Sequence, residues 1–145
     1  MRTFMTRALS LAVLILIGGC GGNGTPTTPT GPDQSNVPYS QTDLQVGTGA
    51  EAVAGKTIVV AYIGWLYNES GQDHKGTQFD SNAAGTFQIG VGSVIKGWDK
   101  GIPGMKVGGI RRLVIPPDLA YGSAGKGPIP PNAALVFDVQ LLAVQ

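Results

Sequence analysis

Alternation of apolar and polar residues is the clearest pattern along this chain, and it predicts two long β-strands. In 135–144 every second residue is apolar, with Asp138 and Gln140 between them. In 57–67 β-branched and aromatic residues dominate, which is typical of strands. The residues expected to face the core are Leu135, Phe137, Val139 and Leu141 in the first stretch, and Ile58, Val60, Tyr62 and Leu66 in the second.

Shorter stretches show weaker strand patterns. Leu44 and Val46 alternate with polar neighbours before a Gly-Thr-Gly turn. A strand at 79–81 is expected to resume, after a short gap, at 86–89, and another at 108–115 ends at two prolines. The polar, glycine-containing stretches expected to be loops are 69–78 and 118–131.

One short stretch has helical spacing instead. Val94 and Ile95 precede Trp98 by four and three residues. Ile102 follows Trp98 by four residues, so these large side chains would share one helix face. Glycine and proline residues in 101–104 end this helix soon after it begins. Trp98 is therefore expected at the centre of the core, or at the floor of a pocket.

One short helix and about five strands predict an α+β fold, in which an antiparallel sheet curls around the helix. The 23 glycines and 10 prolines fit many turns between short strands. Phe87 alternates with Ile89, which favours a place in the core. Arg111 and Arg112 are neighbours in a predicted strand, so we expect one to be exposed and the other to face an edge.

Residues 1–19 predict a bacterial lipoprotein signal peptide. Arg2 and Arg7 give a basic start, and the apolar run 8–17 is too short to cross a bilayer. The stretch Leu-Ile-Gly-Gly-Cys resembles a lipobox, so Cys20 is expected to be lipidated. The protein would then be exported and membrane-anchored, on the periplasmic or outer-membrane face in a Gram-negative host. An ordinary secretory signal with an incidental cysteine is the alternative.

The stretch after the signal peptide differs in composition from the rest of the chain. Residues 20–36 are rich in Gly, Thr and Pro and contain no large aliphatic or aromatic side chain. Such a segment has nothing to bury, so we expect Cys20 to be followed by a flexible tether. The folded domain is expected to span 37–145.

Charge and residue usage argue against several classes of function. Only 13 % of residues are charged, and 10 Lys and Arg stand against 9 Asp and Glu, which favours neither nucleic acid nor acidic lipid. With a single cysteine, no intramolecular disulfide can form. The only histidine, His74, lies in a polar loop, and no residues have the spacing of a metal site or a phosphate loop. We expect no metal, no cofactor and no acid–base triad.

Five short motifs follow one another through the predicted domain. They are Tyr-Ile-Gly-Trp-Leu-Tyr at 62–67, Phe-Asp-Ser at 79–81, Val-Ile-Lys-Gly-Trp-Asp at 94–99, Leu-Ala-Tyr-Gly at 119–122, and Ile-Pro-Pro-Asn with Leu-Val-Phe-Asp-Val at 129–132 and 135–139. Each motif is weak alone, but in this order they resemble the FKBP-type peptidyl-prolyl cis–trans isomerases over roughly 42–144. The resemblance implies a five-stranded sheet wrapped on the helix, with an apolar pocket between them.

The resemblance also implies a set of site residues. The implied catalytic residues are Tyr62, Asp80, Ile95, Trp98, Tyr121 and Phe137, and the implied further substrate-binding residues are Phe79, Val94 and Ile129. Trp98 would form the pocket floor, Tyr121 would offer its hydroxyl at the rim, and the Ile95 N–H would meet a ligand carbonyl. The implied partners are proline-containing polypeptides, with macrocycles of the tacrolimus and rapamycin type as inhibitors. We expect a monomer.

Prolyl isomerisation suits a site without a nucleophile. Rotation about the amide has a barrier of about 18–20 kcal/mol because the planar form is resonance-stabilised. The planar amide is dipolar and well hydrated, so an apolar cavity that removes water penalises it more than the twisted form. A non-catalytic module or holdase, gripping a proline-containing partner in the same pocket, is the alternative function.

Three features depart from the family pattern. Asp80 lacks the arginine that usually supports it, so we expect its carboxylate to accept a hydrogen bond from Tyr62 instead. The segment between Phe79 and Trp98 is short, and it leaves Gly85 or Thr86 where many members carry an aromatic wall residue. The loop tip Lys-Gly-Pro at 126–128 is also unusual. We expect a more open pocket with altered affinity for macrocycles.

Overall fold

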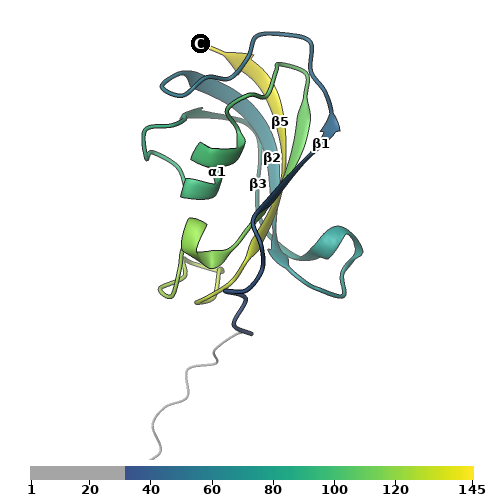
Figure 1. Cartoon of the computed structure of the whole chain (residues 1–145), viewed down its shortest axis with the longest axis vertical. Coiled ribbons are helices and arrows are strands. Elements are labelled where there is room, and N and C mark those ends of the chain that lie inside the picture. Colours follow the sequence, from purple (N-terminus) through teal and green to yellow (C-terminus); the bar gives the residue numbers. More distant parts are fainter. Residues whose placement is uncertain (1–31) are drawn as a thin grey trace, which may run out of the picture.

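The computed structural model describes residues 32–145 and shows a single curled sheet with one α-helix against it (Figure 1). The strands form one antiparallel five-stranded sheet in the order β1-β4-β5-β2-β3. The elements in chain order are β1 Ser40–Gln45, β2 Thr57–Tyr67, a 3₁₀ turn Gln72–His74, β3 Lys75–Gln88, α1 Lys96–Gly101, β4 Ile110–Ile115, a 3₁₀ turn Pro117–Leu119 and β5 Leu135–Val144. This arrangement confirms the predicted fold class.

The predicted signal peptide and Cys20 lie outside the described residues. Within 32–145, no helix is long and apolar enough to cross a membrane.

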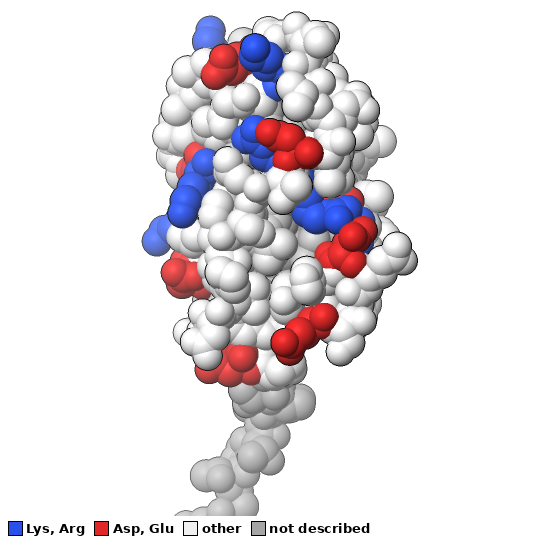
Figure 2. All heavy atoms as spheres, turned by 45° about the vertical axis from the view of Figure 1, so that its right-hand side comes forward, with Lys and Arg blue, Asp and Glu red and all other residues white. Residues whose placement is uncertain are grey.

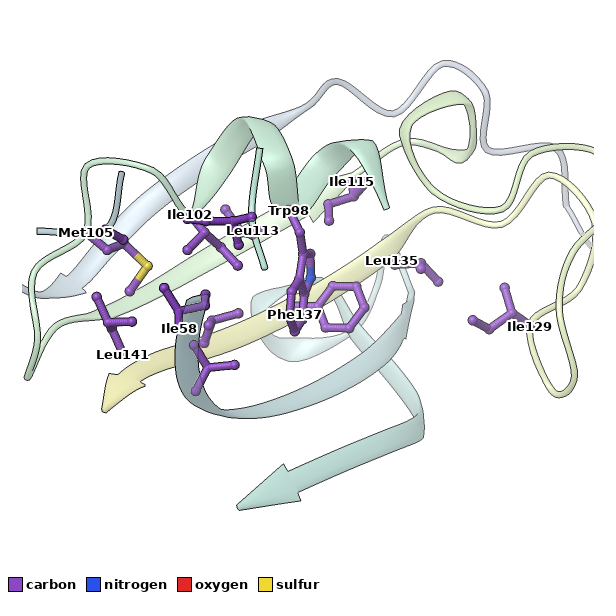
Figure 3. Close-up of a cluster of buried hydrophobic side chains, with 14 of the residues drawn as sticks. Ile58, Trp98, Ile102, Met105, Leu113, Ile115, Ile129, Leu135, Phe137 and Leu141 are labelled. Atoms are coloured by element: carbon purple, nitrogen blue, oxygen red, sulfur yellow. The ribbon is translucent and has the colours of Figure 1, made fainter. Parts of the chain in front are cut away.

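The core lies between α1 and the concave face of the sheet, with Trp98 at its centre (Figure 3). The two long predicted strands are present with the predicted bounds, because their alternation matches the two-residue period of a strand. All the inward residues of β5 are buried, and Ile58 and Val60 of β2 are fully buried. Tyr62 and Leu66 are only partly buried, where the sheet opens beyond the core.

The helix packs closely because glycine faces the sheet. A Cβ on Gly97 would lie 2.5 Å from Cγ2 of Ile115 in β4, well inside van der Waals contact. Any larger residue would therefore push the helix away from the strand. The backbone of α1 lies close to the sheet at this point, which lets the Trp98 indole reach the middle of the core.

Strand β3 differs from the prediction. It is one continuous strand that begins at Lys75, whereas the sequence predicted a loop to residue 78 and a gap before 86. Val60 pairs with Gly85 but Tyr62 pairs with Asn82, so β3 carries an extra residue opposite β2. Such a bulge breaks the alternation of side chains, and the sequence pattern therefore looks like a gap.

Arg111 also differs from the prediction, because its side chain points to the core side of β4 and is buried. Its Nε donates to Asp43 Oδ1 of β1 at 2.6 Å, and its Nη1 donates to the Gly101 carbonyl at the end of α1 at 2.7 Å. The hydrogen bond from Arg111 holds the pKa of the Asp43 carboxyl below its ordinary value. Arg111 therefore joins the edge strand, β4 and the helix.

The outer face of the sheet carries paired charges. Arg112 donates two hydrogen bonds to Asp138, Nε to Oδ1 at 2.7 Å and Nη2 to Oδ2 at 3.0 Å, and Lys75 Nζ lies 2.7 Å from Asp138 Oδ2. Burial alone would raise the pKa of the Asp138 carboxyl, but these hydrogen bonds outweigh it and lower that pKa. Figure 2 shows acidic and basic side chains interspersed on the visible face of the molecule, without a patch of one sign.

The lowered pKa of Asp138 predicts acid sensitivity. A group with a lowered folded-state pKa contributes stability above its unfolded pKa, near ~3.9, and loses that contribution as the pH falls through the folded value. Asp138→Asn should lower the free energy of unfolding at pH 7 by roughly 1–2 kcal/mol and make it less dependent on pH below about 4.

Urea unfolding between pH 2.5 and 7 would measure both effects. Asp118→Asn, at an exposed position in the 3₁₀ turn, is the matched control and should leave the stability unchanged. An Asp138→Asn protein with wild-type stability at pH 7 would contradict this assignment.

Candidate active site

Four aromatic rings form a box at the open end of the core. The Trp98 indole lies edge-to-face against Tyr62, Phe87 and Phe137, with centroid distances of 5.1, 5.3 and 5.4 Å. The four rings come from α1, β2, β3 and β5, so the curl of the sheet around the helix brings them together. Edge-to-face packing is the favoured geometry for aromatic pairs, and it leaves ring faces available to a ligand.

The indole nitrogen of Trp98 is unusual within this box. Among the described residues it is the one buried side-chain N or O atom without a hydrogen-bond partner. A buried N–H without a partner costs free energy, and this one lies among aromatic rings, which supply only weak acceptors. The site therefore keeps a strongly apolar floor at the expense of stability.

A cavity of about 450 Å³ opens over the Trp98 indole. Its volume is in the range of small-molecule sites. The residues that line it are Tyr62, Phe79, Asp80, Phe87, Ser93, Val94, Ile95, Trp98, Ala120, Tyr121, Lys126 and Phe137. Every site residue that the sequence predicted lines this cavity, with the exception of Ile129. Ile129 is 5 % exposed and belongs to the buried core cluster.

Phe87 is the most informative of the residues that the sequence analysis missed as site residues. It was expected in the core, and the aromatic wall position was assigned to Gly85 or Thr86. The Phe87 ring lies in the cavity wall, 6.0 Å from the Tyr62 ring, and a Cβ on Gly85 would lie 2.5 Å from Phe87 Cε2. The expected gap in the wall is therefore filled by an aromatic side chain. The other lining residues that were missed are Ser93, Ala120 and Lys126.

The Phe79 wall depends on a glycine in the neighbouring strand. The rings of Phe79 and Phe137 pack at right angles with centroids 5.6 Å apart. They lie over Gly64 of β2, where a Cβ would be 2.7 Å from Phe79 Cζ and 2.8 Å from Phe137 Cε1. A larger residue at position 64 would displace one of these rings.

The polar side of the cavity is formed by Tyr62 and Asp80. The Tyr62 hydroxyl donates to Asp80 Oδ2 at 2.8 Å, and the Ser81 N–H donates to Asp80 Oδ1 at 2.8 Å. No Lys or Arg of the described residues forms an ion pair with Asp80. Burial and the Asp80 carboxylate together raise the pKa of Tyr62 to about 12, so Tyr62 stays a neutral donor.

Tyr121 also lines the cavity, from the loop between β4 and β5. Its ring is half-buried and packs against the core, and burial, with a smaller contribution from Asp80, raises the pKa of its hydroxyl. Lys126 Nζ, from the tip of the same loop, lies 5.4 Å from the Tyr121 ring centroid. The Tyr121 hydroxyl thus remains protonated at neutral pH and can donate a hydrogen bond.

Ile95 lies at the entry to α1 and takes part through its backbone. Its carbonyl accepts from the Trp98 N–H at 2.9 Å, while its own N–H has no acceptor within residues 32–145. Asp99 fixes the preceding turn by accepting from the Gly90 and Gly92 N–H groups at 2.7 and 2.9 Å. The turn and the helix therefore present the Val94 and Ile95 side chains to the cavity.

His74 is not part of this cavity. It lies in the 3₁₀ turn before β3, where its ring stacks on Tyr67 at 5.1 Å. In the described part of the chain, no three His, Cys, Asp or Glu residues are grouped as metal ligands would be. The chemistry that the cavity's own residues offer is burial of an apolar group between aromatic faces, with hydrogen bonds from its rim.

Comparison with known proteins gives consistent results. Residues 49–142 match the family FKBP-type peptidyl-prolyl cis-trans isomerase. An FK506-binding protein of Neisseria meningitidis serogroup B is 52 % identical over 107 residues, covering 70 % of this chain and 92 % of the relative. FK506-binding protein 4 of Dictyostelium discoideum is 52 % identical over 104 residues, and the match covers 70 % of this chain and 27 % of that relative.

Solved structures show the same likeness. AtFKBP13 superimposes with a TM-score of 0.64 and 40 % identity, covering 78 % of this chain and 98 % of that protein. FkpA from Escherichia coli gives a TM-score of 0.63 and 40 % identity, covering 77 % of this chain and 50 % of that protein. The family match runs from before β2 into β5 and contains the helix and the residues of the aromatic cavity, and this chain belongs to the family of FKBP-type peptidyl-prolyl cis–trans isomerases.

Proposed function

We propose that the aromatic cavity accelerates rotation about X–Pro bonds in exported proteins by removing water from the amide. The observation that supports this most directly is the box of four aromatic rings with a half-open cavity of about 450 Å³ above it. A prolyl ring fits a cavity of this size and apolarity. The amide beside the ring would then be held against aromatic faces in place of water.

The energetic argument follows from the difference between the planar and the twisted amide. The planar form is the more dipolar, so it loses more hydration free energy on entering an apolar site. Each difference of about 1.4 kcal/mol between the two forms accelerates rotation tenfold. The barrier of about 18–20 kcal/mol leaves room for a large acceleration without covalent chemistry.

The rim residues hold the peptide in place. The Ile95 N–H has no acceptor among the described residues and would bind a substrate carbonyl. The Tyr121 hydroxyl, kept protonated by its raised pKa, would donate a second hydrogen bond. Tyr62 is occupied by Asp80, so this pair shapes the cavity edge and keeps a carboxylate near the site.

Macrocyclic ligands are a further expectation for the same cavity. The relatives in Neisseria and Dictyostelium are named FK506-binding proteins. Phe87 supplies the wall that the sequence predicted to be open, so we propose that macrocycles of the tacrolimus and rapamycin type bind here as inhibitors.

The enzyme would act as a membrane-anchored monomer outside the cytoplasm. The support for this is the sequence of 1–20, with its basic start, short apolar run and Cys20. Acyl chains on Cys20 would hold the domain on the membrane through the segment that follows.

One prediction of this proposal concerns the cavity floor. The purified protein should accelerate cis–trans exchange in X–Pro peptides, and Trp98→Leu should lower kcat/KM by about tenfold or more, because a smaller floor leaves the amide partly hydrated. Protease-coupled or NMR exchange assays measure this, with thermal unfolding to show that the variant is folded. A folded wild-type protein that binds such peptides without accelerating them would overturn the enzyme proposal and favour a holdase.

Another prediction concerns the hydrogen bond between Tyr62 and Asp80. Tyr62→Phe should lower kcat/KM about three- to tenfold, because the loss of one solvent-exposed hydrogen bond, about 0.5–1.5 kcal/mol, leaves the cavity edge less firmly held. Tyr67→Phe, in the same strand but away from the cavity, is the matched control and should behave as wild type. Equal activity of the two variants would show that the Tyr62 hydroxyl has no role.

A further prediction concerns lipidation of Cys20 as the membrane anchor. Cys20→Ser should abolish incorporation of labelled fatty acid and shift the protein from the membrane fraction to the soluble exported fraction. Gly19→Ala, within the same motif, keeps the cysteine and should preserve labelling. Membrane association that survives Cys20→Ser would contradict lipidation as the anchor.

A further inference from the structure

We propose that Gln34 is a positioning residue for the loop that carries Tyr121. Gln34 lies in 32–39, the N-terminal strap, which precedes β1 and lies before the residues 49–142 that match the family. The inference rests on the proposed function, because it concerns how the rim of that cavity is held. It extends the active apparatus to a part of the chain outside the family match.

The Gln34 side chain bridges two separating strands. Its Nε2 donates to the Tyr67 carbonyl at 3.0 Å, and its Oε1 accepts from the Ala134 N–H at 2.9 Å. Tyr67 ends β2, and Ala134 immediately precedes β5. The Tyr67 N–H still reaches the Ala134 carbonyl at 2.9 Å, so the Gln34 amide occupies the point where the pairing of β2 with β5 stops.

The Gln34 backbone reaches further into the loop. Its N–H donates to the Asn132 carbonyl at 3.1 Å, and its carbonyl accepts from the Val37 N–H at 3.0 Å. Both backbone groups and both ends of the side-chain amide are therefore used. A residue that the sequence predicts to lie in a flexible tether is therefore bonded to the rest of the domain at three atoms, while its carbonyl closes a turn within the strap.

Asn132 connects the hydrogen bonds of Gln34 to the cavity rim. Its N–H donates to the Gly122 carbonyl at 2.9 Å, and Gly122 directly follows Tyr121. Asn132 has a φ of +56°, a conformation that costs free energy for a residue with a side chain and persists where its neighbours hold it. Two hydrogen bonds thus lead from Gln34, through Asn132, to the residue next to Tyr121.

The loop has few other hydrogen bonds to the rest of the domain. Within the described part of the chain, the backbone groups of residues 120–131 form hydrogen bonds only with other residues of the loop and its 3₁₀ turn. The link from this loop to Gln34 runs through the Asn132 carbonyl, which accepts from the Gln34 N–H. The strap also touches α1, since the Tyr39 ring lies 4.4 Å from Lys100 Nζ. The strap therefore contacts both the loop with Tyr121 and the helix with Trp98.

The test compares two near-isosteric substitutions in the full protein. Gln34→Met removes both side-chain hydrogen bonds, and we expect KM for an X–Pro peptide to rise three- to tenfold with little change in kcat, because Tyr121 holds the peptide outside the rotating bond. Gln45→Met is the matched control. It removes a side-chain amide bond to the Gly108 carbonyl at the far end of β1, and it should leave KM unchanged.

Two further measurements separate positioning from mere stabilisation. Gln34→Glu keeps the acceptor and regains the donor only when its carboxyl is protonated, so KM should approach the wild-type value as the pH falls through the ordinary range of a Glu carboxyl, about 4.3. Amide hydrogen exchange, which does not depend on activity, should quicken at the Asn132 and Ala134 N–H groups in Gln34→Met but not in Gln45→Met.

The outcomes are distinguishable. Wild-type KM and wild-type exchange in a folded Gln34→Met protein would overturn this inference while leaving the proposed function intact. An inactive wild-type protein would overturn the proposed function. The exchange of the loop amides would then still decide whether Gln34 orders the loop.

Discussion

The packing of the Trp98 indole against three aromatic rings is the interaction on which the rest of this structure depends. It fixes the distance between α1 and the sheet, and it forms the floor of the cavity. The same side chain thus serves the core and the site. The indole N–H has no hydrogen-bond partner among the described residues, so the floor of the cavity is apolar. The close approach of Gly97 to β4 and of two phenylalanine rings to Gly64 makes this packing possible.

Charge is arranged so that the cavity remains apolar. The buried guanidinium of Arg111 joins the edge strand to the helix, and Asp138 is neutralised by two cations on the outer face. Asp80 is the carboxylate at the cavity; it accepts hydrogen bonds from a phenol and a backbone N–H and forms no ion pair within residues 32–145. Its partner Tyr62 is thereby kept protonated. The rim offers donors while the floor offers only ring faces, which suits an amide that must lose its water.

The loop between β4 and β5 shows how such a small domain can hold a flexible-looking segment in place. The loop contains Tyr121, and several of its glycines have positive φ, so its own sequence does little to restrict it. Burial of Ile129 anchors one side, and the hydrogen bonds of Gln34 hold the end next to β5. The cavity rim is thus supported by core packing and by the chain segment that precedes the sheet.

The sequence by itself determined the elements with regular local periods, which are β2, β5 and the helix around Trp98. These follow from alternation and helical spacing, which are properties of neighbouring residues. Most of the cavity residues were predictable only because five short motifs, in their order, resemble the FKBP-type family. Tertiary structure alone decided the burial of Arg111, the bulge in β3, the place of the Phe87 ring in the cavity wall, the place of Ile129 in the core and the hydrogen bonds of Gln34. Each depends on a partner distant in sequence, with Gln34 and Ala134 separated by 100 residues. A local pattern carries no information about such a partner, because it records which faces are apolar and not what those faces meet.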